Sequence, residues 1–254
     1  MKKLRPWDAL ITATPTWQGG FTHTLAKLAI KYFQWAPWHL GHGRNSWPTH
    51  ARHFVGKLNP RMIGAAYRAG QLEQCAVDAG MTIYAYVGAL TAFDDWSFSQ
   101  TDPFAKWERL AWFEDKERIA VCRPIFCHPD QIRHSFLESQ CWRFIGRSYD
   151  RWQLLGIWFN SLLGLEPDEY RRYLDKGKSF TVCSGAVAAH WEALRREIQK
   201  EWADAGGRMD DLHRSECPFP WPRLFGGLHV ERVAPSHFLT EPNEWEVMSD
   251  NGKR

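Results

Sequence analysis

The chain has 254 residues, of which 44% are hydrophobic and 24% charged, so it is long enough for a large core and is not disordered throughout. Its formal net charge is only +3, without the clustered basic stripe that nucleic-acid-binding proteins usually show. The 15 tryptophans indicate a thick aromatic core, an aromatic-lined groove, or both. None of the 6 cysteines forms a CxxC pair, so we expect reduced thiols in a cytoplasmic protein without a bound metal or other cofactor.

The N-terminal residues predict neither a leader peptide nor a membrane anchor. The basic start, Met1–Arg5, is followed by Trp7–Thr12, which is too short for the apolar region of a signal peptide and contains an acid. No stretch approaches the roughly 18 apolar residues of a spanning helix. We therefore expect no transmembrane segment, and the oligomeric state stays open.

The beginning of the chain predicts a strand, a helix and a loop. Residues 8–15 have the pattern of a short strand that ends at Pro15. Residues 21–35 place apolar side chains at helical spacing. Residues 36–49 are rich in Pro, Gly, His and Trp, which is typical of a loop.

A hairpin and two further strands are predicted in the middle of the chain. The short runs 50–55 and 61–67 flank a turn at Asn59 and Pro60, which suggests a β-hairpin. Residues 81–88 and 118–126 have the composition of strands.

Helices dominate the predicted C-terminal part. Residues 129–145 and 149–164 have helical periodicity, and residues 181–204 predict a long helix that stops at the glycines after Ala205. Residues 240–254 form a polar tail, which we expect to be loose. Because helices and strands occur without regular alternation, the predicted fold class is α+β.

Cys183 is the candidate nucleophile. It lies in the first turn of the predicted helix 181–204, where the partial positive charge of a helix N-terminus lowers the pKa of a thiol. Small residues follow at Ser184–Ala186, so a substrate carbonyl could approach and accept a hydrogen bond from the Cys183 N–H. The alternative interpretation is that Cys183 is a small buried hydrophobe.

A catalytic thiol needs a histidine as its base, and the chain has 11 histidines. His190 lies on the same predicted helix as Cys183, about two turns away, which is too far for a base. Position alone does not choose among the remaining N-terminal candidates, which are His23, His39, His42, His50 and His53.

Five short segments are similar to one set of motifs in order along the chain, with Ala51 and Arg52 in place of Val-Gly and Gly185 and Ala186 in place of Glu-Leu. They are Trp7–Ile11 (G-D-x-L-hydrophobic), Thr49–Gly56 (S-H-V-G-hydrophobic-hydrophobic-V-G), Tyr149–Gly156 (Y-D-x-x-x-L-L-G), Phe180–Val187 (W-x-C-S-E-L-V) and Ala234–Leu239 (P-S-D-L). These motifs are those of the circularly permuted papain-like cysteine enzymes, the YiiX/YebB-type relatives of the NlpC/P60 superfamily, which the chain therefore resembles. The His-to-Gly spacing in the second segment favours His50 over His53 as the catalytic histidine.

The resemblance implies a permuted papain-like (NlpC/P60-like) fold, in which an antiparallel sheet packs against helices. It implies a single domain over residues 1–239, with a possible insertion at 100–130 that carries no family motif, before the tail at 240–254. It also implies that Cys183 is the nucleophile and His50 the base.

The implied activity is that of a cysteine hydrolase or acyltransferase. The resemblance implies two substrate classes, the peptide cross-links of muropeptides and lipid acyl esters or amides. Trp38, Trp47 and Tyr149 are the candidate substrate-binding residues. The tryptophans have an equally ordinary interpretation as part of the core.

The chain departs from the family at the acid that orients the histidine. The family has a glutamate after the histidine strand, whereas here Gly64 or Ala65 stands at the comparable position. The orienting group is then missing or comes from elsewhere, and Glu73 and the pair Asp94 and Asp95 are candidates without motif support. A backbone carbonyl or a side-chain amide could also orient the ring, or the protein could be inactive.

Three other functions compete with a cysteine enzyme. The first is a catalytically inactive papain-like binding or structural protein, which the missing acid favours. The second is a metal-dependent hydrolase that uses the histidines clustered at His39, His42, His50 and His53, although no HExxH motif is present. A nucleic-acid-binding protein is the weakest, and no nucleic acid is expected as a partner.

Overall fold

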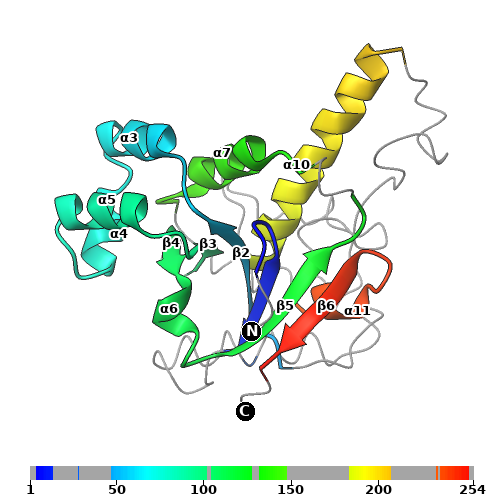
Figure 1. Ribbon diagram of the computed structural model, residues 1–254, viewed down its shortest axis with the longest axis horizontal. Coiled ribbons are helices and arrows are strands. Elements are labelled where there is room, and N and C mark those ends of the chain that lie inside the picture. Colours follow the sequence, from blue (N-terminus) through cyan, green and yellow to red (C-terminus); the bar gives the residue numbers. More distant parts are fainter. Residues whose placement is uncertain are drawn as a thin grey trace, which may run out of the picture.

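The structure, a computed structural model, describes residues 4–13, 28, 47–101, 104–127, 132–147, 183–206, 233 and 235–251. Its centre is a six-stranded sheet in the order β4-β3-β2-β1-β5-β6, in which each neighbouring pair is antiparallel (Figure 1). Together with its helices, this sheet confirms the α+β class.

Six strands and seven helices make up the regular structure of the described residues. The strands are β1 (Ala9–Ala13), β2 (His50–Gly56), β3 (Trp96–Gln100), β4 (Ala105–Arg109), β5 (Arg118–Pro124) and β6 (Trp245–Asp250). The helices are α3 (Pro60–Arg68), α4 (Glu73–Asp78), α5 (Ile83–Ala92), α6 (Leu110–Phe113), α7 (His134–Phe144), α10 (Cys183–Asp204) and α11 (His237–Thr240).

The two faces of the sheet carry different side chains, because successive residues of a strand point to opposite faces. One face, which we call the helix face, packs against α7 and α10, which lie side by side across the sheet (Figure 1). The other, which we call the Arg52 face, carries a smaller apolar cluster and the Arg52 side chain. Strand residues of the helix face include Ala9, Ile11, Ala51, Val55 and Phe98, and those of the Arg52 face include Leu10, Arg52, Phe54, Ile119 and Val121.

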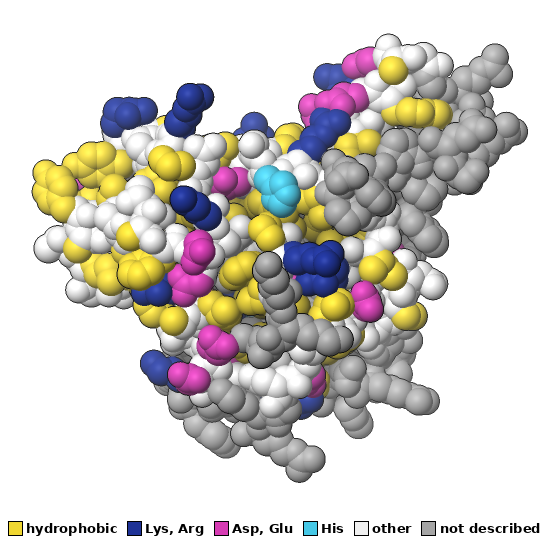
Figure 2. All heavy atoms as spheres, in the orientation of Figure 1, with side chains coloured by type: hydrophobic (Ala, Val, Ile, Leu, Met, Phe, Trp, Pro, Cys, Tyr) yellow, Lys and Arg dark blue, Asp and Glu magenta, His cyan; other side chains and the backbone are white. Residues whose placement is uncertain are grey.

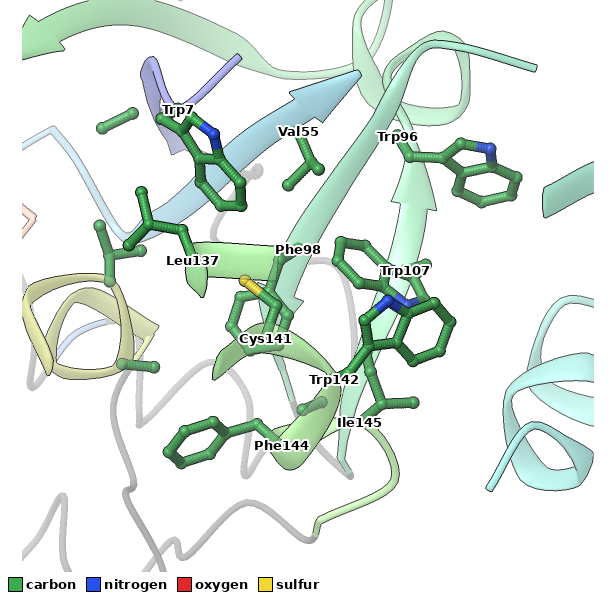
Figure 3. Packing of buried hydrophobic residues seen from close by; sticks show 14 of the residues in the cluster. Trp7, Val55, Trp96, Phe98, Trp107, Leu137, Cys141, Trp142, Phe144 and Ile145 are labelled. Atoms are coloured by element: carbon green, nitrogen blue, oxygen red, sulfur yellow. The ribbon is translucent and has the colours of Figure 1, made fainter. Parts of the chain in front are cut away.

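Aromatic side chains fill the core on the helix face (Figure 3). Trp7, Trp96, Trp107 and Trp191 are each at most 1% exposed. Their rings meet other rings edge to face, as in the pair Trp107 and Trp142, whose centroids are 5.1 Å apart. Such pairs add about 0.5–1.5 kcal/mol each beyond the burial of area. Many of the tryptophans are therefore accounted for by the core.

Four predicted elements are confirmed by the structure. The strands predicted at 8–15 and 118–126 correspond to β1 and β5, and the helices predicted at 129–145 and 181–204 correspond to α7 and α10. Gly206, two residues after the last residue of α10, has a positive φ of 94°. A glycine in this conformation ends a helix, as expected from the sequence. The helices predicted at 21–35 and 149–164 lie outside the described residues, apart from Leu28.

The strand predicted at residues 81–88 is wrong, because this segment forms α5. The side chain of Thr82 accepts a hydrogen bond from the Ala85 N–H at 3.3 Å and caps the helix. The β-branched and aromatic residues of the segment favour a strand only weakly, and packing on the helix face overrides that preference.

The hairpin predicted after His50 is also wrong in its second half. β2 is followed by the helix α3, which starts at Pro60. Asn59 caps α3 by accepting the Arg61 N–H at 2.9 Å, and a proline at the first helical position has no N–H to leave unpaired. The Asn-Pro pair therefore begins a helix here and does not make a hairpin turn.

The expectation of a loose tail is wrong in part, and the region of the possible insertion contains regular structure. Residues 245–250 of the predicted loose tail form β6, which pairs with β5 and is joined to it by an ion pair of Arg118 and Asp250 at 2.6 Å. The possible insertion at 100–130 supplies β4, α6 and β5, and β5 lies between β1 and β6. This region is therefore part of the sheet. No helix among the described residues is both long and apolar enough to cross a membrane.

Candidate active site

Cys183 opens α10, and this helix packs mainly against β2. The thiol is only 4% exposed and receives backbone hydrogen bonds from Ala51 and from Ser184. The hydroxyl of Ser184 donates to the backbone carbonyl of Val233 at 2.5 Å, which ties the start of the helix to the C-terminal segment. The first turn of α10 is therefore fixed against the beginning of β2.

The pKa of the Cys183 thiol is raised from its usual value. Burial is the main cause, since a thiolate is poorly solvated inside a protein. Backbone hydrogen bonds and the positive charge of Arg52 oppose this effect without overcoming it. The thiol is therefore protonated at neutral pH, and a base must take its proton before it can attack. The other described cysteines, which are Cys75, Cys122, Cys127 and Cys141, are also free and buried.

His50 is the first residue of β2 and is half-buried. In the sheet it pairs with Thr12, whose hydroxyl contacts Arg52, so the imidazole belongs to the Arg52 face. Its Nε2 atom lies 2.8 Å from the Oγ atom of Ser99 on β3. The structure thus brings Cys183 to Ala51, the residue after His50, while the hydrogen bond of the imidazole is with Ser99.

Arg52 lies at the centre of a buried network of charges on the same face. Its guanidinium contacts Glu117 at 2.8 Å and Glu108 at 3.1 Å, and it lies over the Phe113 ring. Lys106 approaches Glu108 at 3.5 Å. Each carboxylate is therefore compensated, as buried charges must be.

Ser99 is also among the groups that lower the pKa of the Glu108 carboxylate. Burial by itself would raise the pKa of Glu108, but the charges of Arg52 and Lys106 outweigh it and the pKa is lowered. Glu108 is therefore ionised at neutral pH. His50, Ser99 and Glu108 form a chain of polar groups that leads from the imidazole to the buried charges.

His53 lies on the other side of β2, in the core. Its ring stacks on that of His190, with centroids 5.4 Å apart, and His190 in turn has Nδ1 at 3.6 Å from the Cys141 sulfur. Burial lowers the pKa of His53 to about 3 and that of His190 well below its usual value. Both rings are therefore neutral core groups, which the sequence did not indicate for His190.

The three candidate substrate-binding residues do not come together in the described part of the chain. Trp38 and Tyr149 lie outside the described residues. Trp47 is half-buried against the core, and the Arg118 guanidinium lies 4.2 Å from the centre of its ring. Trp47 thus has a structural role in the described contacts.

The acids considered as orienting groups lie elsewhere. Glu73 is in the first turn of α4, and Asp95 is held by Arg109 at 3.0 Å. Among the described contacts of His50 is the one with the Ser99 hydroxyl. No sequence signal could have found Ser99, because its closeness to His50 depends on the register of β3 against β2.

Gln100, the residue after Ser99, is a second feature that the sequence did not indicate. It is 1% exposed, and neither polar atom of its amide has a hydrogen-bond partner among the described residues. The pairing of Arg52 with Ser99 places Gln100 opposite Ala51, and Gln100 also pairs with buried Ala105. Gln100 therefore lies on the helix face, near the strand position that contacts Cys183.

The described residues contain no group of three or more His, Cys, Asp or Glu side chains arranged to hold a metal ion. Two of the histidines considered for a metal site, His39 and His42, lie outside the described part of the chain. Comparisons with protein-family models, with curated proteins and with solved structures find no match for this chain. The function must therefore be inferred from the geometry around Cys183 and His50.

Proposed function

We propose that this chain is a cysteine hydrolase or acyltransferase with a permuted papain-like fold, in which Cys183 is the nucleophile and His50 the base. One observation carries the proposal: the Cys183 thiol lies against the backbone of Ala51, which follows His50 in β2. A long helix that begins with a cysteine and packs on the strand that opens with a histidine brings the backbones of the two residues together. Because the His50 imidazole lies on the Arg52 face, the proposal requires this ring to turn toward the thiol at the end of β2 before it can act as the base. The histidine strand comes early and the cysteine helix late in the chain, which is the permuted order.

His50 would take the proton from Cys183, and the thiolate would attack the carbonyl carbon of an amide, ester or thioester. The Cys183 backbone N–H would donate a hydrogen bond to the negatively charged oxygen that forms. His50 would then give its proton to the leaving group as the tetrahedral intermediate collapses to an acyl-enzyme. Transfer of the acyl group to water makes the protein a hydrolase, and transfer to another acceptor makes it an acyltransferase.

The proposed substrates are muropeptides or lipid acyl esters and amides. The proposed location of the protein is the cytoplasm. Trp38 and Tyr149, which lie outside the described residues, remain the proposed substrate-binding residues, whereas Trp47 packs against the core and beside Arg118. Both classes present a carbonyl beside a bulky group, which aromatic rings can hold by contact.

The test is the rate at which iodoacetamide modifies each cysteine, followed by mass spectrometry between pH 6 and 9. Cys127 is the internal reference, because it is 8% exposed and its pKa is raised by burial to about 12. We expect Cys183 to react faster than Cys127, and His50→Ala to slow Cys183 alone by about 100-fold, at the lower end of what a positioned base contributes.

A Cys183 that reacts as slowly as Cys127, with no response to His50→Ala, would contradict the proposal. The second candidate, a catalytically inactive papain-like binding protein, would then take its place. Two observations favour it: burial raises the pKa of Cys183, and hydrophobic side chains gather on the surface over α3, α4 and α5 (Figure 2). This surface includes Val77 and Tyr84, which are 69% and 77% exposed.

A further inference from the structure

We infer that the side-chain amide of Gln100 is a hydrogen-bond donor to the oxyanion that forms when Cys183 attacks a carbonyl group, beside the backbone N–H of Cys183. This role rests on the proposed function, in which Cys183 is the nucleophile, and it adds a catalytic residue on β3. It does not depend on the direction of the His50 ring, because the amide contacts the substrate oxygen and not the base.

Gln100 lies on the helix face of the sheet. Phe98, two residues earlier in β3, belongs to the core cluster of that face, and its ring centroid is 5.0 Å from that of His190 on α10. Side chains two residues apart in a strand share a face, so the Gln100 side chain is directed toward the layer that contains α10. Its burial, with only 1% of its surface exposed, agrees with this direction.

The Cys183 thiol lies beside the same strand position. The register of β2 against β3 places Gln100 opposite Ala51, and the Ala51 backbone forms a hydrogen bond with the Cys183 sulfur. Opposed side chains on one face have Cβ atoms about 4.5–5.5 Å apart, a distance that a glutamine side chain can span. On its other side Gln100 pairs with Ala105, so small side chains on both neighbouring strands leave space for the amide.

The hydrogen-bonding capacity of the Gln100 amide is unused in the described part of the chain. Neither Nε2 nor Oε1 has a hydrogen-bond partner there. A buried polar group without a partner destabilises the folded state, so its presence in a folded protein requires an explanation. The Nε2 group carries two N–H donors, and a substrate oxygen that enters beside the thiol is a partner for one of them.

The chemistry of the attack requires donors at this place. When the sulfur bonds to the carbonyl carbon, the π electron pair of the C=O bond moves onto the oxygen, which becomes negatively charged. The N–H groups in the first turn of a helix, such as that of Cys183, make no hydrogen bond within the helix and can donate to this oxygen. The Gln100 amide adds a donor from the side of the sheet. Collapse of the intermediate returns the electron pair to the carbonyl group and expels the leaving group.

The test compares two reagents that modify the same thiol in the full-length protein. Iodoacetamide reacts by displacement at a saturated carbon and forms no oxyanion, whereas p-nitrophenyl acetate acylates the thiol through a tetrahedral oxyanion. Mass spectrometry follows the modification of Cys183 by each reagent. We expect Gln100→Met to slow acetylation of Cys183 by about 100-fold, the effect of removing one oxyanion donor, and to leave the alkylation rate unchanged.

The matched control is Gln140→Met. Gln140 is also a buried glutamine, 8% exposed on α7, but its amide oxygen accepts a hydrogen bond from Arg143 at 3.3 Å. This variant should leave both rates at the parent value. A second measurement is the urea midpoint of unfolding. Methionine removes the unpaired amide of Gln100 at similar volume, so we expect Gln100→Met to unfold at or above the parent midpoint.

A Gln100→Met variant that acetylates as fast as the parent, or that loses the same factor with both reagents, would overturn the role of Gln100 and leave the nucleophile in place. A lower urea midpoint in this variant would also overturn it, because the amide would then be bonded within the folded protein. A parent protein whose Cys183 reacts with neither reagent contradicts the proposed function and the role of Gln100 together.

Discussion

At the scale of single residues, Arg52 is the group on which the buried polar network depends. It is the shared partner of Glu108 and Glu117, and all three side chains are less than 20% exposed. A buried ion pair adds little net stability compared with apolar groups of the same size, but removal of one partner leaves the other charge without compensation. The network is therefore expected to be sensitive to single substitutions.

We predict that Arg52→Met lowers the free energy of unfolding by about 3–5 kcal/mol, because two carboxylates would stay buried without their guanidinium. Urea unfolding followed by circular dichroism measures the change. The control is Arg109→Met: Arg109 pairs with Asp95 where both side chains are more than 20% exposed, so it should cost about 0–1 kcal/mol. Equal losses in the two variants would show that the network does not carry buried charge.

The residues of the candidate site differ in how far they could be predicted. Cys183 and His50 are visible in the sequence, because each lies in a recognisable local pattern. Ser99, Glu108 and Gln100 are not, since they reach the site only through the pairing of β2, β3 and β4. Strand register depends on contacts between segments that are distant in the sequence, and no local pattern in this chain encodes it.

At the scale of elements, the predictions are correct where one signal dominates and wrong where two compete. The apolar residues of α10 keep helical spacing over its 22 residues, so the sequence predicts that the segment is a helix and where it begins and ends. In α5, Tyr84, Tyr86 and Val87 favour a strand, whereas the capping residue Thr82 and the alanines favour a helix. The capping residue Thr82 is the signal that indicates a helix. The strand-like composition of the segment outweighs this signal in a prediction from the sequence.

We predict that Thr82→Ala destabilises the protein by about 1 kcal/mol, because the Ala85 N–H loses its side-chain acceptor. The loss is measured by thermal or urea unfolding. Thr91→Ala is the control within the same helix, since Thr91 donates only to carbonyls inside the helix and alanine is the better helix former. If the two variants lose the same free energy of unfolding, the Thr82 cap does not contribute to stability.

At the scale of the whole molecule, the sequence predicted the fold class but not the order of the strands. β6 joins the sheet beside β5, although the two are separated by the whole C-terminal half of the chain. Its burial pattern shows one buried residue, Trp245, followed by exposed and half-buried ones, as expected of a strand at an edge. A polar edge strand and a loose tail look alike in sequence, because neither has an apolar face.

The buried pair His53 and His190 gives the whole molecule a predictable response to acid. Both pKa values are lowered in the folded protein, and that of His53 is about 3, because burial disfavours the charged ring. Below an unfolded value of about 6.5, the unfolded chain binds protons that the folded chain does not. The free energy of unfolding therefore falls as the pH drops below 6.5, by about 1.4 kcal/mol per pH unit for each histidine.

We predict this loss in urea unfolding measured at intervals between pH 7.5 and about 4.5, a range that ends where the carboxylates of an unfolded chain begin to bind protons. His53→Leu should reduce the slope of unfolding free energy against pH by about 1.4 kcal/mol per unit, since one of the two contributing rings is gone. Leu137→Ala is the control, because Leu137 lies in the same core cluster and its loss lowers stability without removing a titrating group. A slope that is the same in His53→Leu as in Leu137→Ala would mean that His53 is protonated in the folded protein, and would place a solvated or paired imidazole where the structure has a neutral one.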